Sequence, residues 1–304
     1  MSRIVVSGAT GFVGKSLSRA LVEKGYEVVA LTRDPARAGG LLPSGVRAER
    51  WDPGTDSKTV PGVDGASAVV HLAGEPAVGQ RWTERVKAEI MDSRVKSAEL
   101  LVSAIERASV RPKVLVSSSG VGYYGPHRDE ALHEKAPAGA DYLARVTIAW
   151  EGAAIRAEMA GVRVVRTRFG IIFGKNGGAL VEMVKPFKLF VGGPIGSGKQ
   201  IVSWVHLDDA VSALVLCLED QTISGAVNVV SPNAVPNEEL AQRIGAILKR
   251  PSAITVPEIA LRIRFGEGAD PLITGQRAIP AVLQAKGFSW KYPEVRAALE
   301  DALG

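Results

Sequence analysis

The sequence has very few of the side chains that build disulfide frameworks and metal sites. Cys217 is the single cysteine, and the apolar run around it predicts a buried, unreactive thiol. The four histidines lack the spacing of metal ligands, so we expect no bound metal. The longest apolar runs, such as residues 210–218, are shorter than the roughly 18–20 residues that cross a bilayer. We therefore expect a cytoplasmic protein with no membrane partner.

Charges of both signs are present, with a small excess of positive charge. The 304 residues include 37 Lys and Arg against 32 Asp and Glu, which gives a net charge of +5. This balance is compatible with an anionic substrate or with nucleic acid. In residues 81–101, however, basic and acidic side chains alternate, which is typical of a solvated helix face. We expect a small anionic substrate and no nucleic-acid partner, and no pattern indicates an oligomeric state.

The order of apolar segments predicts an α/β fold. Short β-branched runs alternate with helical patterns through the first two thirds of the chain, which is typical of a doubly wound parallel sheet of the Rossmann type. The expected strands are residues 3–7, 27–32, 46–51, 67–72, 113–118, 162–167 and 226–230. Loops rich in Gly and Pro follow residue 168. We therefore expect a nucleotide-binding Rossmann core and a small C-terminal substrate lobe; the core spans residues 1–170 with a return segment at 205–230, and the lobe spans 171–204 and 231–304.

A glycine-rich loop, "SGATGFVG", follows the first expected strand. Gly8 permits a tight turn from strand to helix, Gly11 lets the backbone approach a pyrophosphate, and Gly14 allows close helix packing. The loop lies between a strand and an amphipathic helix, which is the context that dinucleotide binding requires. We therefore expect the cofactor to contact Gly8, Thr10, Gly11, Phe12, Val13 and Gly14.

The end of the second expected strand indicates which dinucleotide is favoured. An acidic residue there would bind the ribose hydroxyls of NAD, whereas this chain has "LTRD", with Arg33 near that point. An arginine can pair with the 2′-phosphate of NADP, so the sequence favours NADP(H). In the alternative, Arg33 is a solvated turn residue and Asp34 binds the ribose. Asp52, after the third strand, lies either near the adenine or in a turn.

The segment at residues 192–198 is also dense in glycine and lies in the expected substrate lobe. Glycine-dense backbone has little to hold it, and Lys199 and Gln200 beside it can reach an anion. We expect a mobile cover over the substrate, with a plain surface turn as the alternative.

Several longer motifs together resemble one protein family. They cover most of the chain: "GATGFVG" (8–14), "HLAGEPAVGQRWTERVKAEIMDSRV" (71–95), "SSSGVGYYG" (117–125), "RTRFGIIFGKNGGAL" (166–180), "GGPIGSGKQIVSWVHLDDAV" (192–211) and "GQRAIPAVLQAKGF" (275–288). With them the chain resembles the extended or atypical short-chain dehydrogenases/reductases. Among these it is similar to the nucleoside-diphosphate-sugar epimerase-like proteins of the YfcH type, some of which are labelled as cell-division-inhibitor homologues.

The resemblance implies roles for residues at the end of the fourth expected strand. Leu72, Ala73 and Gly74 would lie against the adenosine ribose and the pyrophosphate. His71 would be a core histidine whose ring nitrogens are bonded inside the protein. The alternative is a role for His71 as an acid or base.

The resemblance also implies roles for the segment after the fifth strand. Ser118 or Ser119 would bond a reacting carbonyl beside the nicotinamide, so Ser118 is a candidate cofactor contact and Ser119 a candidate catalytic group. In the alternative, these serines only cap the strand. Tyr123 and Tyr124 follow on a loop that would face the substrate pocket.

The acid–base pair of that superfamily is absent from residues 139–154. Its members carry a tyrosine, a lysine and a glutamate at successive spacings of four, and alignment on Glu151 places Leu143 and Thr147 at the first two positions. Neither can transfer the proton or lower the pKa of a tyrosine. Tyr142 lies about 100° around the helix from the required position, and it has no lysine four residues later. We expect Tyr142 to be a packing or surface residue.

Two functions are compatible with such a site. The first is an NADP-dependent epimerase or reductase of a sugar nucleotide or similar anionic compound. Its relocated catalytic groups would be Ser119, Tyr123 or Tyr124, assisted by Arg81 or Arg94. The second is a regulatory protein, linked to cell division, that binds the dinucleotide but has lost catalysis.

Overall fold

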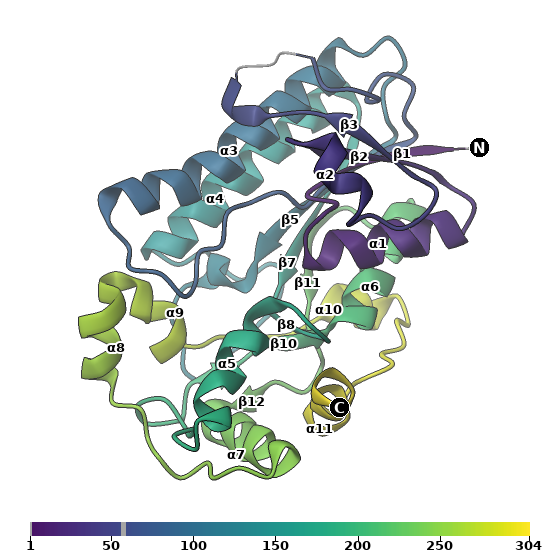
Figure 1. Ribbon diagram of the computed structural model, residues 1–304. Helices are drawn as coiled ribbons and strands as arrows, with labels where there is room; N and C mark the ends of the chain where they lie inside the picture. The colour runs from purple at the N-terminus through teal and green to yellow at the C-terminus, as the bar shows by residue number, and fades with distance from the viewer. Residues whose placement is uncertain (1, 56–58) are drawn as a thin grey trace.

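Seven parallel strands form the central sheet of the protein (Figure 1). The computed structural model describes residues 2–55 and 59–304. The strand order is β11-β7-β5-β4-β1-β2-β3. These strands are β1 (Arg3–Ser7), β2 (Glu27–Thr32), β3 (Val46–Arg50), β4 (Ala68–His71), β5 (Val114–Gly120), β7 (Arg163–Phe169) and β11 (Gly225–Val229). The order confirms the predicted Rossmann type of α/β fold, and each expected strand is present within two residues at either end.

Helices cover both faces of this sheet. On one face α1 (Phe12–Glu23) contacts α6 (Leu207–Glu219), and on the other α3 (Glu84–Arg107) contacts α4 (Tyr142–Ile155). Neighbouring residues of a strand point to opposite faces, so each strand contributes to both layers. Val6 of β1 joins the apolar cluster that contains Leu17 of α1, whereas Val5 joins the cluster that contains Leu101 of α3.

The strand order reverses between β1 and β4, which are neighbours in the sheet. At such a point the chain leaves the two strands in different directions, and a crevice opens at the carboxyl edge. The loops after the two strands nevertheless touch: a Cβ atom added to Gly8 would lie 2.8 Å from the backbone nitrogen of Ala73. Gly8 also has a φ of +70°, which glycine adopts without strain.

A second group of elements packs against the sheet around its own apolar cluster (Figure 1). Phe173 and Trp204 stack there with ring centroids 5.5 Å apart. Three short strand pairs belong to the rest of the chain: β8 (Ile171–Phe173) with β10 (Trp204–His206), β9 (Ile201–Val202) with β12 (Val235–Pro236), and β6 (Ala131–Leu132) with β13 (Arg277–Ala278). The remaining α-helices are α2 (Pro35–Gly39), α5 (Gly178–Lys188), α7 (Asn237–Leu248), α8 (Glu258–Phe265), α9 (Asp270–Ile273), α10 (Ala281–Ala285) and α11 (Val295–Leu303).

Cys217 is buried in α6, as predicted. Burial raises the pKa of its thiol to about 12, which keeps it protonated and unreactive. Residues 2–55 and 59–304 contain no group of three or more side chains arranged to hold a metal ion. Over the same part of the chain, no helix combines the length and apolarity needed to cross a bilayer.

His71 ends β4 inside the protein, and the structure confirms that it is a core histidine. Its Nδ1 lies 2.7 Å from the Ser7 hydroxyl and its Nε2 lies 3.1 Å from the Ser97 hydroxyl. Ser97 donates its own proton to the Ser93 carbonyl, so Nε2 donates to Ser97 and Nδ1 accepts from Ser7. Burial, with a smaller contribution from the charge of Arg94, lowers the pKa of His71 to about 4.

The close packing at Gly14 can be tested with two matched substitutions in helices. A Cβ atom on Gly14 would lie 2.2 Å from the Gly8 carbonyl oxygen, whereas one on Gly152 meets nothing within 4 Å. We expect Gly14→Ala to lower the free energy of unfolding by about 1–3 kcal/mol because the clash outweighs helix propensity. Gly152→Ala should raise it by up to about 1 kcal/mol. Urea denaturation measures both, and equal effects would contradict the close packing.

The buried, neutral His71 predicts a loss of stability in mild acid. The unfolded chain takes up a proton near pH 6.5, whereas folded His71 does so only near pH 4. Stability from this residue is therefore fully present above pH 6.5 and is lost as the pH falls, by about 2 kcal/mol at pH 5. Urea denaturation at pH 7 and pH 5 should show a smaller loss for His71→Gln than for the wild type. His133→Gln, at an exposed histidine, is the control; an unchanged pH dependence in His71→Gln would disprove the assignment.

Candidate functional site

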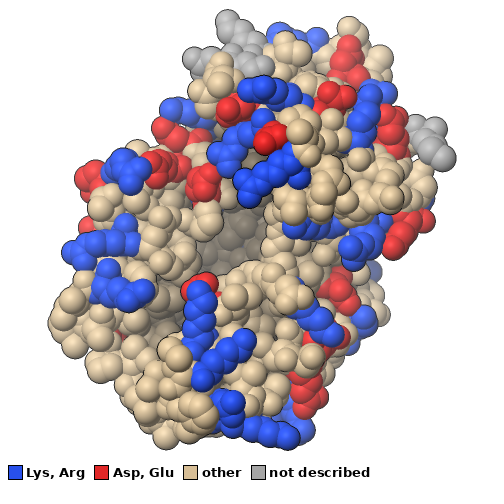
Figure 2. All heavy atoms as spheres, viewed as in Figure 1, with Lys and Arg blue, Asp and Glu red and all other residues tan. Residues whose placement is uncertain are grey.

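The carboxyl edge of the sheet faces the second group of elements. Phe12, which follows the glycine loop, packs its ring against that group, since a Cβ atom on Gly177 would lie 2.2 Å from Phe12 Cδ2. Figure 2 shows a deep hollow between the two parts, with Lys and Arg side chains gathered along its upper edge. Open α/β sheets bind ligands in the crevice at this edge. The hollow is therefore the candidate active site.

The start of α1 is open to an anion. Its N-cap is Gly11, which provides no capping side chain, and its first turn contains no acidic residue. The first N–H groups of a helix have no partner within the helix and attract negative charge. Thr10 and Val13 lie half-buried beside them. These residues fit the pyrophosphate of a dinucleotide.

The end of β2 leaves an arginine available and an aspartate engaged. The Arg33 side chain is 74% exposed, and its ion pair with Glu75 is long, at 3.9 Å. The Asp34 carboxylate accepts a hydrogen bond from the N–H of Arg37 and caps α2. Asp52 accepts a hydrogen bond from the N–H of Gly54, which matches the turn alternative for that residue.

A buried ion pair holds Ser119. The Ser119 hydroxyl donates to Glu151 at 2.7 Å, and the Arg168 guanidinium bonds both oxygens of the same carboxylate at 2.8 and 2.9 Å. Arg166 adds a bond at 3.0 Å. Ser119 and Arg168 are neighbours across β5 and β7, and Glu151 reaches them from α4. Burial lowers the pKa of Arg168, but its bonds to Glu151 outweigh this and raise the pKa, so Arg168 stays protonated.

Tyr123 and Tyr124 have different surroundings. Tyr124 is fully buried, and its hydroxyl donates to Asn228 Oδ1 at 2.7 Å and accepts from Arg168 at 3.0 Å. Burial raises the pKa of Tyr124, and Arg168 opposes this shift. Tyr123 is half-buried, with its ring centroid 3.4 Å from the guanidinium carbon of Arg168. Its hydroxyl is neither sealed from solvent nor bonded to another residue that the structure describes.

Ser118 points to the other face of β5. Side chains alternate along a strand, so Ser118 shares the face of Val114 and Val116, which pack with α1 and α6. Within residues 2–55 and 59–304 its hydroxyl has no hydrogen-bond partner, and it is not sealed from solvent. Ser118 thus has an available hydroxyl on the side of the sheet from which the glycine loop leads into α1.

α4 carries the residues aligned with the acid–base pair of the superfamily that the sequence resembles. Thr147 is buried, and its hydroxyl donates to carbonyl groups of its own helix. The Tyr142 hydroxyl donates to the Lys87 carbonyl at 2.5 Å, and its ring meets that of Trp82 with centroids 4.9 Å apart. Tyr142 is therefore a packing residue that joins α4 to α3, as predicted.

Three residues around Ser119 were missed by the sequence reasoning: Arg166, Arg168 and Asn228. A signal was present for the two arginines, because they follow the apolar pair Val164 and Val165 in a run that forms an internal strand of the sheet. Arginine is almost never fully buried without a partner. The partner, Glu151, lies on a different element, so spacing along the chain does not reveal the pair.

Residues 192–198 are packed against another segment. The N–H of Gly196 donates to the Val256 carbonyl, and the N–H of Val256 donates to the Pro194 carbonyl, both at 2.9 Å. A Cβ atom on Gly193 would lie 2.2 Å from the Ile254 carbonyl oxygen. The glycines allow this close packing, which does not fit the expected mobile cover.

Two of the longer motifs hold distant segments together. In "SWVHLDD", the Asp209 carboxylate accepts hydrogen bonds from the N–H groups of Lys291 and Tyr292 at 2.7 and 3.0 Å. In "GQRW", Arg81 donates to the carbonyl of Ile263 in α8 at 2.6 Å. These contacts give both motifs a structural role.

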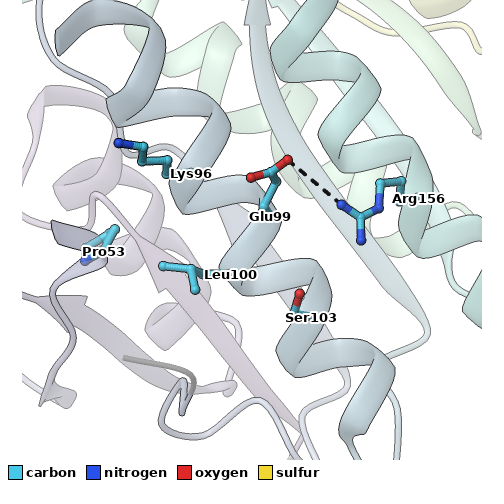
Figure 3. A pocket seen from close by; sticks show the side chains of 6 residues that line it. All are labelled: Pro53, Lys96, Glu99, Leu100, Ser103 and Arg156. Carbon is cyan, nitrogen blue, oxygen red and sulfur yellow. Dashed lines mark ion pairs between the residues drawn. The ribbon is translucent and has the colours of Figure 1, made fainter. Parts of the chain in front are cut away.

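Two surface cavities contain none of the predicted site residues. One, of about 390 Å³, lies between residues 75–80 and the first half of α3. The other, of about 360 Å³, lies beside the middle of α3, where Glu99 and Arg156 form an ion pair at 3.9 Å (Figure 3). Its lining residues are Pro53, Lys96, Glu99, Leu100, Ser103 and Arg156. We assign no function to either cavity.

Comparison with known proteins identifies related proteins across the whole chain. The family described as "NAD dependent epimerase/dehydratase family" matches residues 4–230, and a domain of unknown function matches residues 256–302. The chain is 39% identical over 302 residues to the chloroplastic epimerase family protein SDR39U1 homolog of Arabidopsis thaliana, which covers 97% of this chain and 85% of that protein.

Solved structures agree with this relationship. Human epimerase family protein SDR39U1, crystallised with NADPH, is 34% identical with a TM-score of 0.87, over 99% of this chain and 98% of that one. The nucleoside-diphosphate sugar epimerase from Corynebacterium glutamicum is 30% identical with a TM-score of 0.79, over 100% of this chain and 58% of that one. The findings confirm the predicted resemblance, and this chain belongs to the NAD-dependent epimerase/dehydratase family.

Proposed function

We propose that the protein is an NADP(H)-dependent reductase or epimerase that acts on a sugar nucleotide or a similar anionic small molecule, without a Tyr-x-x-x-Lys pair. One observation carries the proposal: the glycine loop, the loop after β4 and the open start of α1 converge at the point where the strand order reverses. The NADPH in the human SDR39U1 crystal and the description of the Corynebacterium protein support the cofactor and the substrate class.

The choice of NADP(H) rests on the end of β2. Arg33 is exposed and only weakly paired, so its guanidinium can bind a 2′-phosphate. Asp34 is engaged as the cap of α2, which disfavours the alternative in which it binds the ribose. The remaining cofactor contacts would be Gly8, Thr10, Gly11, Phe12, Val13, Gly14, Leu72, Ala73, Gly74 and Ser118.

The proposed chemistry places Tyr123 ahead of Tyr124 as the proton donor. NADPH, when bound, supplies a hydride to a carbonyl carbon. Tyr123 would donate a proton to the carbonyl oxygen, because its hydroxyl is uncommitted. Tyr124 would first have to break its bonds to Asn228 and Arg168.

The two serines lie on opposite faces of β5 and would bind ligand oxygen atoms in different ways. The Ser118 hydroxyl is available to donate a hydrogen bond to a carbonyl oxygen. The Ser119 proton is committed to Glu151, so Ser119 would accept a hydrogen bond from a substrate hydroxyl.

A specific observation favours the second candidate, a catalytically silent NADP(H)-binding regulator. The hydroxyls of Ser119, Tyr124 and Thr147 are all bonded within the protein. Such a protein would bind NADPH tightly and turn over no carbonyl substrate.

The proposal also assigns a binding role to each of the two parts of the chain. Residues 171–204 and 231–304 would form the substrate-binding lobe, and residues 1–170 with 205–230 would form the cofactor-binding core. We propose a cytoplasmic location and a small-molecule substrate without a nucleic-acid or membrane partner. The relative in Arabidopsis is described as chloroplastic.

The role of Arg33 predicts a preference between cofactors. NADPH should bind at least about tenfold more tightly than NADH, which corresponds to about 1.4 kcal/mol. Arg33→Ala should lose this preference by weakening NADPH alone, since only NADPH carries the 2′-phosphate. Fluorescence titration measures both affinities, with Arg19→Ala, at an exposed arginine of α1, as the control. Equal affinities in the wild type, or an unchanged preference in Arg33→Ala, would reject the assignment.

The surroundings of the tyrosines predict different effects for three Tyr→Phe variants. Tyr123→Phe should lower NADPH-dependent turnover by about 10²–10⁴ with little change in stability. Tyr124→Phe should lower the free energy of unfolding by about 1–3 kcal/mol, because Asn228 and Arg168 lose a buried partner. Tyr142→Phe should leave turnover nearly unchanged. The measurements are steady-state rates at matched cofactor saturation and urea denaturation.

Two outcomes would contradict this assignment of the tyrosines. A large loss of turnover only in Tyr142→Phe would show that the alignment on Glu151 is wrong. No loss in any of the three variants would transfer the role to Ser119 or Arg81, or favour the regulatory function.

A further inference from the structure

Arg94 is held in a fixed place on α3, close to the hollow. It is half-buried, and one terminal nitrogen donates to the carbonyl of Ile90 at 3.0 Å. The guanidinium carbon lies 5.2 Å from the centre of the Trp150 ring, so the indole supports the charge from one side. These contacts fix the guanidinium before any ligand arrives.

Arg94 has no carboxylate within ion-pair distance among residues 2–55 and 59–304. Arg168, which is 2% exposed, instead bonds both oxygens of Glu151. Burial lowers the pKa of Arg94, with Tyr142 and Glu75 opposing the shift. A cation withdrawn from water without a counter-ion destabilises the fold. Arg94 therefore contributes less to stability than its packing suggests.

The remaining N–H groups of Arg94 are accessible and lie beside the loop after β4. Each guanidinium nitrogen of Arg94 either has a hydrogen-bond partner or is accessible to solvent. A Cβ atom on Gly74 would lie 3.3 Å from the guanidinium carbon, so the glycine backbone and the cation are adjacent. Gly74 directly follows Ala73, which touches Gly8 of the glycine loop. The unpaired charge thus borders the crevice at the reversal of strand order.

We propose that Arg94 binds an anionic oxygen, of a phosphate or a carboxylate, in a molecule held in this cleft. The inference rests on the proposed function for the identity of that molecule, which is either the dinucleotide or the anionic substrate. It accounts for a cation beside Trp150 with no protein counter-ion. It also supplies a positive charge to a site whose α4 carries Thr147 at the aligned lysine position.

The test compares Arg94→Met with Arg85→Met. Methionine retains an apolar stem that can pack on Trp150 but removes the unpaired charge. Arg85 lies on the same helix, is 80% exposed and pairs with Glu89, so it provides the matched control. Titrations would use NADPH, UDP-glucuronic acid on the protein saturated with NADP⁺, and inorganic pyrophosphate as a simple anion. Thermal denaturation without ligand would be recorded for each variant.

We expect Arg94→Met to keep or raise the melting temperature and to weaken at least one ligand by about 10- to 100-fold, as expected for a lost charge-assisted hydrogen bond. Arg85→Met should change no affinity by more than about twofold, as expected for an exposed ion pair. A loss confined to NADPH identifies the dinucleotide as the source of the anion, and a loss confined to UDP-glucuronic acid identifies the substrate. Arg94→Lys keeps the charge and should lose less affinity than Arg94→Met. If Arg94→Met does not fold, the affinities of Arg94→Lys are compared with those of the wild type instead.

Three results would overturn the inference. The first is an Arg94→Met protein that matches the wild type for every ligand the wild type binds. The second is a lower melting temperature with unchanged affinities, which a purely structural arginine would produce. The third is a wild type that binds none of the three ligands. A wild type that binds pyrophosphate or UDP-glucuronic acid through Arg94 but neither NADPH nor NADH would instead disprove the proposed function alone.

Discussion

The carboxylate of Glu151 is bonded by three side chains from two strands of the sheet. Glu151 is 3% exposed, and it receives Arg168 and Arg166 from β7 and the Ser119 hydroxyl from β5. A buried carboxylate with no partner would cost several kcal/mol, and these bonds supply its partners. The same bonds fix the carboxyl ends of β5 and β7 against α4. The geometry of the hollow on this side depends on that one charged group.

This anchoring limits the chemistry that the site can perform. Through Arg168 the network continues to Tyr124 and from there to Asn228, so two hydroxyls near the hollow serve the fold. Polar groups bonded in such a network are held rigidly, and moving one of them leaves its partners unpaired. Proton transfer is therefore more readily assigned to groups outside the network. Ser118 and Tyr123 are the hydroxyls at this strand end that meet that condition.

Local patterns predict the strands and the glycine turn between β1 and α1 well, because each is encoded within a short stretch of chain. Apolar runs define the strands, and Gly14 packs against Gly8 and Ala9 of the same loop. Side-chain partners across the fold are not encoded in this way. Glu151 and Arg168 meet only after α4 packs on the sheet, so the hydroxyl orientation of Ser119 could not be predicted. The packing of residues 192–198 on residues 254–256 could not be predicted for the same reason.

The distribution of unpaired positive charge links stability to ligand binding. Glu151 pairs with Arg166 and Arg168 of β7, whereas Arg33 has only a long ion pair and Arg94 has none among the described residues. Both lie beside the loop after β4, Arg33 through Glu75 and Arg94 through Gly74. An anion bound between them would supply the counter-charge that the protein itself withholds. A ligand at about 100 times its Kd stabilises the folded state by about 2.7 kcal/mol, so an anion that paired with these two cations would stabilise the fold as it binds.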